Sequence, residues 1–126
     1  MRETGTHKTE AYRDCIDRIV RKQKAYRDAC FNASRLAEMI GVERYELSRI
    51  LKIDFGMSFT DMVNGLRTED AMKYLKDTRL KGCTIDDIGA MAGFGNRQTF
   101  HEEFKKRTGS TPAQYRTSNT HKPPTK

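Results

Sequence analysis

Two short helical patterns separated by a glycine turn, within residues 84–116, most strongly limit what this chain can fold into. Thr84 and Asp87 match a capping box, in which a threonine caps a helix and an acidic side chain three positions later caps it in return. The apolar residues that follow recur at helical spacing and mark one buried stripe: Ile85, Ile88, Met91 and Ala92. The pattern predicts a short amphipathic helix that ends at Gly93-Phe94-Gly95.

A second helix is predicted directly after this turn. Asn96 can cap its start, and Gly109 can end it. Phe100 and Phe104, four residues apart, give it a buried face. Thr111-Pro112 then places a cap before a proline at the first position of a third helix. Two short helices joined by a tight turn form a helix-turn-helix, whose second helix can enter the major groove of DNA.

The same pattern occurs a second time, earlier in the chain. When Leu47 is laid over Phe100, residue types coincide along both segments. The matched pairs are Lys52 with Lys105, Gly56 with Gly109, and Ser58 with Thr111, while Gly41 lies over Gly93 with one extra residue in the second turn. A generic helical domain would rarely repeat these positions, so two helix-turn-helix units are predicted.

The predicted fold class is all-α, with two helix-turn-helix subdomains, a long linker helix and an extra N-terminal amphipathic helix over about residues 9–26. The apolar residues of that first helix fall at i, i+3, i+4, i+7 and i+8: Tyr12, Cys15, Ile16, Ile19 and Val20. The opposite face of this helix is basic. That face is either solvated or contacts phosphate or an anionic membrane. The chain is expected to divide into five segments. Residues 1–8 form a disordered N-terminus, residues 9–57 contain the first helix and the first helix-turn-helix, and residues 58–77 form the linker helix. Residues 78–116 contain the second helix-turn-helix, and residues 117–126 form a disordered tail.

Composition narrows the possible functions. The chain has 126 residues and a net charge of +7, which is expected of a protein that binds a polyanion. Three widely spaced cysteines without a C-x-x-C argue against a disulfide framework and a zinc site. No secretory signal or long apolar run is present, so the cytoplasm is expected. Three scattered histidines and the lack of a phosphate-binding glycine loop predict a protein that is not an enzyme and has no cofactor or metal.

One long motif points to a family: I-x-x-I-G-x-x-A-G-F-x-N-x-x-x-F-x-x-x-F-K-K-x-x-G-x-T-P-x-x-Y-R, beginning at Ile85. It resembles the C-terminal signature of AraC/XylS-type transcription regulators, and the similarity extends over about residues 32–116. The resemblance implies a bacterial transcription factor that binds double-stranded DNA sequence-specifically. It also implies RNA polymerase as a further partner and a sensing domain outside this chain, so the chain is either a stand-alone regulator or an output domain. No segment of the chain is expected to hold a small effector in a pocket.

Candidate base-reading residues lie on the outward side of each predicted recognition helix. In the first helix Arg49 can donate two hydrogen bonds to guanine, and Tyr45 can pack on a thymine methyl group. In the second helix Gln98 can pair with adenine, while Thr99 can meet phosphate or a thymine methyl group. His101 is either a base contact or an ordinary solvated side chain. The full set, supported by the positions that match the family, is Arg44, Tyr45, Ser48, Arg49, Arg97, Gln98, Thr99 and His101.

Candidate phosphate contacts are basic residues near the ends of the recognition helices, together with polar groups near helix N-termini, whose unpaired N–H groups favour anions. The set is Lys52, Thr60, Asn96, Lys105, Lys106 and Arg107, with a solvated face as the alternative for each. By resemblance Arg67, Tyr115 and Arg116 serve structure, so they are left out of the set.

Two features depart from the family pattern. Glu102 and Glu103 are expected at exposed positions, where phosphate would repel them unless they accept a hydrogen bond from cytosine. This leaves open whether the second unit reads bases or only holds phosphates, and Glu43 and Glu46 raise the same question in the first unit. Gly89 stands where alanine is usual, which costs about 0.5–1 kcal/mol in a helix interior.

The linker helix suggests a geometry for DNA binding. About 20 helical residues span roughly 30 Å, close to the ~34 Å between successive major-groove faces on one side of B-DNA. One chain could then place two recognition helices in adjacent major grooves, and because the two units differ in sequence, the site would be asymmetric. The alternative is a protein-interaction module of the same fold that has lost DNA readout.

Overall fold

The computed structural model describes residues 11–121, which form helices, turns and loops without a strand. The chain divides into two compact units. Unit 1 comprises Met1–Tyr26 and Cys30–Val63, and unit 2 comprises Arg27–Ala29 and Asn64–Lys126. The predicted all-α fold class is confirmed.

The N-terminal helix of unit 1 buries three residues of the predicted apolar stripe, while Tyr12 and Cys15 are half-buried. Residues 11–16 are α-helical, and η1 (Asp17–Lys22) continues them as a π-helix. The side chains that this helix buries are Ile16, Ile19 and Val20. The helix ends before the expected limit near residue 26, because Lys24 has a positive φ of 58°, which lies outside the right-handed helical region. A short 3-10 turn, η2 (Ala25–Arg27), follows, and the expected disordered segment 1–8 lies outside the described residues.

The first helix-turn-helix consists of α2 (Ala33–Ile40) and α3 (Arg44–Phe55). Asn32 caps α2 by accepting a hydrogen bond from the Arg35 backbone N–H at 2.8 Å. Gly41 ends α2 with φ 77°, a conformation that favours glycine. The buried side chains of the two helices are Leu36, Ala37, Leu47 and Leu51. Two further apolar side chains of these helices are less buried: Ile50 of α3 is half-buried, and Met39 of α2 is 53% exposed.

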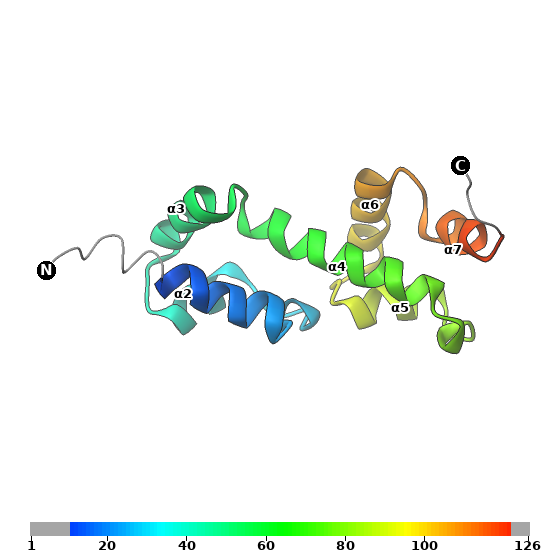
Figure 1. The fold of residues 1–126 in the computed structure, drawn as a ribbon, viewed down its shortest axis with the longest axis horizontal. Helices are drawn as coiled ribbons and strands as arrows, with labels where there is room; N and C mark the ends of the chain where they lie inside the picture. The colour runs from blue at the N-terminus through cyan, green and yellow to red at the C-terminus, as the bar shows by residue number, and fades with distance from the viewer. Residues whose placement is uncertain (1–10, 122–126) are drawn as a thin grey trace, which may run out of the picture. The chain divides into compact units, whose positions relative to one another are not determined.

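Helix α4 (Phe59–Lys76), drawn in green in Figure 1, contributes its beginning to unit 1 and the rest to unit 2. Ser58 begins it, because its Oγ accepts a hydrogen bond from the Asp61 backbone N–H at 3.1 Å. Thr60 is therefore the second residue of the helix and does not cap it. Within unit 2 the helix also buries polar residues, which its apolar pattern did not predict: Asn64, Arg67, Thr68 and Asp70.

Two of these buried groups attach the segment Arg27–Ala29 to α4 within unit 2. Arg27 Nε donates to Asp70 Oδ2 at 2.7 Å. Arg67 Nη2 donates to the backbone oxygen of Asp28 at 3.3 Å. Burial lowers the pKa of Arg67, and the nearby Asp28 carboxylate partly offsets this. The structural role that the family resemblance implied for Arg67 agrees with these contacts.

Unit 2 contains η3 (Thr78–Leu80), α5 (Ile85–Ala92), α6 (Arg97–Thr108) and α7 (Pro112–His121). Its core consists of Ala71, Leu75, Ile88, Ala92, Phe94, Phe100 and Phe104. Met91, expected in the apolar stripe of α5, is 40% exposed, since it lies beyond the edge of the face that contacts this core. Helix α7 extends to His121, into the segment expected to be a tail, and residues 122–126 lie outside the described range.

The predicted capping groups of unit 2 are confirmed. Thr84 and Asp87 form a capping box through two reciprocal hydrogen bonds of 3.0 Å. Asn96 Oδ1 accepts from the Thr99 backbone N–H at 2.8 Å. Thr111 and Gln114 exchange hydrogen bonds at the start of α7, directly before Pro112. Each helix of the second helix-turn-helix therefore begins where its sequence predicts.

The two helix-turn-helix units match in length as well as in sequence. Helices α2 and α5 each have 8 residues, and α3 and α6 each have 12. Both 12-residue helices end at a left-handed glycine, Gly56 with φ 71° and Gly109 with φ 84°. The pair Leu47 and Phe100, which aligned the two copies, is buried in both units. The predicted internal repeat is confirmed by these equivalent positions.

Gly89 makes room for Phe100. A Cβ atom added at Gly89 would lie 2.4, 2.8 and 2.9 Å from three ring atoms of Phe100. The interpretation of Gly89 as merely a weak helix former was therefore incomplete, because glycine allows the phenyl ring to approach the α5 backbone.

We expect Gly89→Ala to lower the free energy of unfolding by about 1–3 kcal/mol, because overpacking outweighs the better helix propensity of alanine. Chemical denaturation followed by circular dichroism measures this change. Gly65→Ala on α4 is the matched control, since its added Cβ meets only the end of the Arg107 side chain, at 3.4 Å. Equal stabilities of the two variants would contradict the close approach of Phe100.

Candidate nucleic-acid interface

The predicted first recognition helix, α3, presents mostly polar side chains on its outward side, together with the exposed Ile53. Leu47 and Leu51 are buried on the inner side of the helix, in the core of unit 1. All the residues predicted to face outward are exposed: Arg44, Tyr45, Ser48, Arg49 and Lys52. Tyr45 is 69% exposed, an unusual degree of exposure for an aromatic ring. The inside–outside assignment made from spacing therefore agrees with the structure of α3.

The outward side chains of α3 are available to a ligand. Within residues 11–121, no hydrogen bond or ion pair engages the side chains of Arg44, Ser48, Arg49 or Lys52. Three of these four residues are cationic, and all four carry hydrogen-bond donors. A row of unengaged donors on a helix surface suits an extended acceptor-rich anion such as a nucleic acid.

The second recognition helix, α6, differs because carboxylates engage its outward side chains. Arg97 Nε donates to Asp86 Oδ1 of α5 at 3.1 Å. Gln98 Nε2 donates to Glu102 Oε2, one turn further along α6, at 3.0 Å. Arg97 and Gln98 are exposed, whereas Thr99 and His101 are half-buried. The predicted base-reading residues of α6 are therefore at the surface to different degrees.

The C-terminal end of α6 is basic, but Glu103 neutralises part of its charge. Lys105, Lys106 and Arg107 are all exposed residues in the last turn. Glu103 lies 2.9 Å from Arg107 Nε and 3.6 Å from Lys106 Nζ. The side chain of Glu103 is only 17% exposed, so the expectation that it is an exposed repulsive charge is wrong. These two ion pairs within α6 compensate the negative charge of Glu103 on a helix that is expected to approach phosphate.

The two predicted phosphate contacts near helix N-termini occupy different positions. Asn96 is exposed, but its Oδ1 already accepts the capping hydrogen bond from Thr99. A phosphate at this end of α6 would therefore be held by unpaired backbone N–H groups of the first turn. Thr60 is exposed in the first turn of α4, where Ser58 provides the cap.

His101 lies between the core and the outward face of α6. Its ring contacts Phe100 edge-on, with centroids 5.3 Å apart. Its Nε2 is buried and has no hydrogen-bond partner within the described residues, and it lies 3.7 Å from Asp86 Oδ1. His101 is therefore positioned by its surroundings and is not a fully solvated side chain.

Tyr115 and Arg116 of α7 hold unit 2 together. The Tyr115 ring packs edge-on against Phe104, with centroids 5.4 Å apart. Arg116 Nη2 donates to the backbone oxygen of Leu80 at 3.1 Å. The structural roles that the resemblance implied for both residues agree with these contacts.

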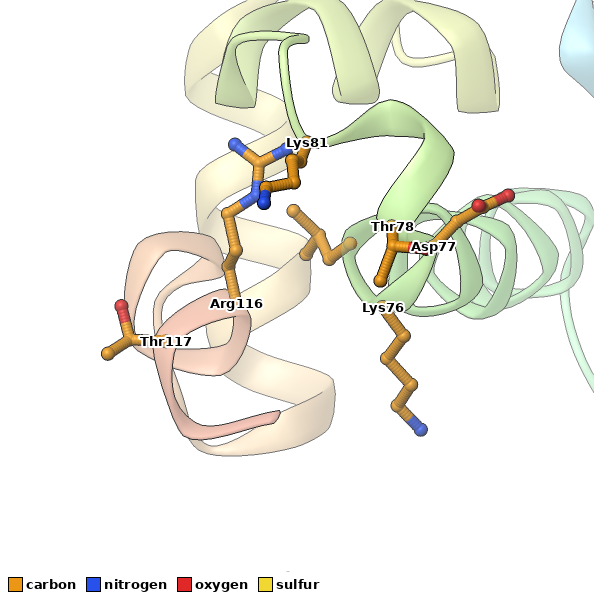
Figure 2. A pocket seen from close by; sticks show the side chains of 7 residues that line it. Lys76, Asp77, Thr78, Lys81, Arg116 and Thr117 are labelled. Carbon is orange, nitrogen blue, oxygen red and sulfur yellow. The ribbon is translucent and has the colours of Figure 1, made fainter. Parts of the chain in front are cut away.

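Unit 2 also contains a cavity of about 510 Å³ between the end of α4, the turn that follows it and α7 (Figure 2). Its lining consists of Leu75, Lys76, Asp77, Thr78, Lys81, Arg116 and Thr117. Hydrogen bonds from Arg79 to both carboxylate oxygens hold the pKa of Asp77 below its usual range. This volume is within the range of ligand sites. Its excess of positive charge would favour an anion.

Two further findings concern the described part of the chain as a whole. No helix within residues 11–121 is long and apolar enough to cross a membrane. No group of three or more histidine, cysteine, aspartate or glutamate residues in the same range could hold a metal ion.

Comparison with known proteins identifies the family. A family model described as a helix-turn-helix domain matches residues 36–118, which is more than half of the chain. The chain belongs to the AraC/XylS-type helix-turn-helix family. Members of this family are DNA-binding transcription regulators, and its DNA-binding domain is generally not an enzyme.

Two relatives and one solved structure illustrate this membership. The probable transcription factor PqrA of Proteus vulgaris is 34% identical over 85 residues, which are 68% of this chain and 67% of PqrA. The xylose operon regulatory protein of Escherichia coli K12 is 29% identical over 112 residues, which are 86% of this chain but only 28% of that protein. The C-terminal domain of the two-component response regulator yesN from Fusobacterium nucleatum superposes with a TM-score of 0.70 at 31% identity. That match covers 87% of this AraC/XylS-type chain and 98% of the yesN domain.

Proposed function

We propose that this chain binds double-stranded DNA sequence-specifically and thereby regulates transcription, with α3 and α6 entering adjacent major grooves. The observation that carries the proposal is the row of exposed, unengaged donors on α3. The equivalent helix α6 repeats the length, the left-handed C-terminal glycine and the buried positions of α3 in a second unit. Because the outward residues of the two helices differ, the proposed site is asymmetric and is bound by one copy of the chain.

The length of α4 supports this two-groove proposal. Its 18 residues span about 27 Å of helix. Successive major-groove faces on one side of B-DNA are about 34 Å apart. A continuous helix of this length is a suitable connector for two recognition helices that act on adjacent grooves.

Each proposed contact has a chemical role. Arg44 and Arg49 would donate to guanine, Tyr45 would pack against a thymine methyl group, and Ser48 would donate to a base or a phosphate. On α6, Gln98 and Thr99 would read bases beside Arg97 and His101. The proposed phosphate contacts are Lys52, Thr60, Asn96, Lys105, Lys106 and Arg107. We place this activity in the cytoplasm, with RNA polymerase and a sensing domain outside this chain as further proposed partners.

Selection from random duplex DNA by the purified chain, at near-physiological salt, tests the proposal. Two unlike motifs about 10 base pairs apart in fixed orientation are the expected result. A single motif beside an unselective turn would mean that α6 only holds the DNA backbone. A pool without any enrichment would contradict sequence-specific binding.

Arg49→Ala should relax the base preference under α3. Because a bidentate arginine–guanine pair discriminates by about 1–3 kcal/mol, the variant should lose this much affinity for the selected duplex and less for random duplex. Fluorescence anisotropy with both duplexes measures the difference. Lys52→Ala is the matched control on the same helix and should weaken both affinities alike. Equal losses for Arg49→Ala would show that Arg49 contacts phosphate only.

A second candidate function is a protein-interaction module that has kept the fold. Its support is the set of glutamates on or beside the recognition helices: Glu43, Glu46, Glu102 and Glu103. In the structure Glu103 pairs with Arg107 on α6, which leaves less unpaired negative charge at that surface, while Glu102 accepts a hydrogen bond from the neutral Gln98. This pairing favours the DNA-binding proposal over the interaction module.

A further inference from the structure

Asp86, in the first turn of α5, contacts two outward residues of α6. Its Oδ1 accepts a hydrogen bond from Arg97 Nε at 3.1 Å. The same oxygen lies 3.7 Å from His101 Nε2. Arg97 and His101 are four residues apart on α6 and therefore lie on the same side of that helix. One carboxylate of α5 thus touches two of the four residues proposed to read bases from α6.

The local sequence fixes this arrangement. The capping box of Thr84 and Asp87 sets the start of α5 and so the direction of its first turn. The Asn96 cap sets the start of α6 at Arg97. Gly89 and Phe100 bring the two helices close together one turn further along. Asp86 and Arg97 therefore meet across the turn because three independent local features place their helices.

The ion pair with Asp86 leaves part of the Arg97 guanidinium available as a hydrogen-bond donor. Asp86 accepts a hydrogen bond from Nε, and the Arg97 side chain forms no other hydrogen bond within residues 11–121. Both terminal amino groups of the guanidinium therefore stay available. Two parallel donors of this kind match the O6 and N7 acceptors of guanine. A side chain that such a hydrogen bond restrains also loses less conformational entropy when it binds.

We propose that Asp86 is a specificity-determining positioning residue of the second recognition helix, which holds Arg97 for bidentate donation to guanine with His101 beside it. This inference rests on the proposed function, because it requires α6 to lie in the major groove. Asp86 itself touches Arg97 and contributes no base contact. The second unit then reads sequence through an arginine supported by α5.

A purely electrostatic role would have the opposite signature. A carboxylate near DNA is repelled by phosphate, so its removal would strengthen binding to every duplex if repulsion were its only effect. A positioning role predicts weaker discrimination while affinity for random DNA stays the same or rises. The ratio of the two affinities therefore separates the two roles.

The test uses the full chain and the duplex that wild type selects, together with duplexes in which the guanine under α6 is replaced by each other base. Asp86→Ala should lower the preference for guanine at least about fivefold, and Asp86→Asn serves if the alanine variant does not fold. In an Arg97→Ala background, Asp86→Ala should change this preference no further. Glu69→Ala, which removes one exposed carboxylate from α4, is the control for charge and should leave the preference intact.

An unchanged guanine preference in a folded Asp86→Ala or Asp86→Asn variant would overturn the inference. Independent, additive losses in the Arg97→Ala background would overturn it as well. A wild-type chain that selects a motif for α3 alone would refute this inference and leave the proposed DNA binding intact. A wild-type chain that selects no sequence would instead refute the proposed function itself.

Discussion

Phe100→Ala should lower the free energy of unfolding of unit 2 by about 3–5 kcal/mol, because truncating a buried phenylalanine removes its apolar contacts and leaves a cavity. Phe100 is 1% exposed, and its ring centroid lies 5.1 Å from that of Phe94 and 5.9 Å from that of Phe104. The lost ring also contacts the α5 backbone at Gly89, which has no side chain to fill the space. Thermal unfolding together with amide hydrogen exchange measures both the size and the location of the change.

The location of the change is the sharper part of this prediction. Protection should fall in α5 and α6, while the core of unit 1 around α2 and α3 keeps its protection. Leu47→Ala, at the equivalent buried position of α3, should produce the reverse distribution. Met91→Ala, at an exposed position of α5, should change the stability little. Unchanged stability of Phe100→Ala would mean that its inward assignment is wrong.

The positions of helix starts and buried faces could be predicted because the residues that determine them are close in sequence. Thr84 and Asp87 are three residues apart, and Phe100 and Phe104 are four apart, so one turn of helix brings each pair together. Met91 was assigned wrongly by the same spacing rule. Periodicity gives the direction of an apolar stripe but not its width, which depends on what packs against it.

The buried polar residues of α4 could not be predicted in this way. Asp70 is buried because Arg27, 43 residues earlier in the chain, supplies a charged partner. Arg67 is buried because the backbone at Asp28 accepts its hydrogen bond. A buried charge requires such a partner, and a partner this distant in sequence leaves no periodic signal.

The candidate interface likewise contains features that residues close in sequence predict and a contact that they do not predict. Exposure of Arg49 and Tyr45 followed from the buried positions on the opposite side of α3. The contact of Asp86 with Arg97 did not, because it crosses the turn between two helices and spans 11 residues. An acidic residue in the first turn of a helix also has a local explanation in the helix dipole, which conceals its second role.

DNA affinity should fall steeply with salt, because each lysine or arginine that neutralises a phosphate releases a condensed counterion. Four of the proposed phosphate contacts are cationic: Lys52, Lys105, Lys106 and Arg107. Four such contacts predict a slope of log K against log salt of about −3.6, which is roughly a 150-fold loss of affinity between about 50 and 200 mM salt, or about 3 kcal/mol. Fluorescence anisotropy across a salt series measures the slope.

Variants on α6 connect this slope to individual residues. Lys105→Ala should make the slope shallower by about 0.9, since one phosphate contact is lost. Glu103→Gln should make it steeper, because it removes the carboxylate that competes with phosphate for Lys106 and Arg107. A slope near zero in wild type would mean that phosphates are not neutralised and would favour the protein-interaction module. A steep slope that Lys105→Ala leaves unchanged would instead move the phosphate contacts away from the end of α6, toward α3 or the cationic cavity of unit 2.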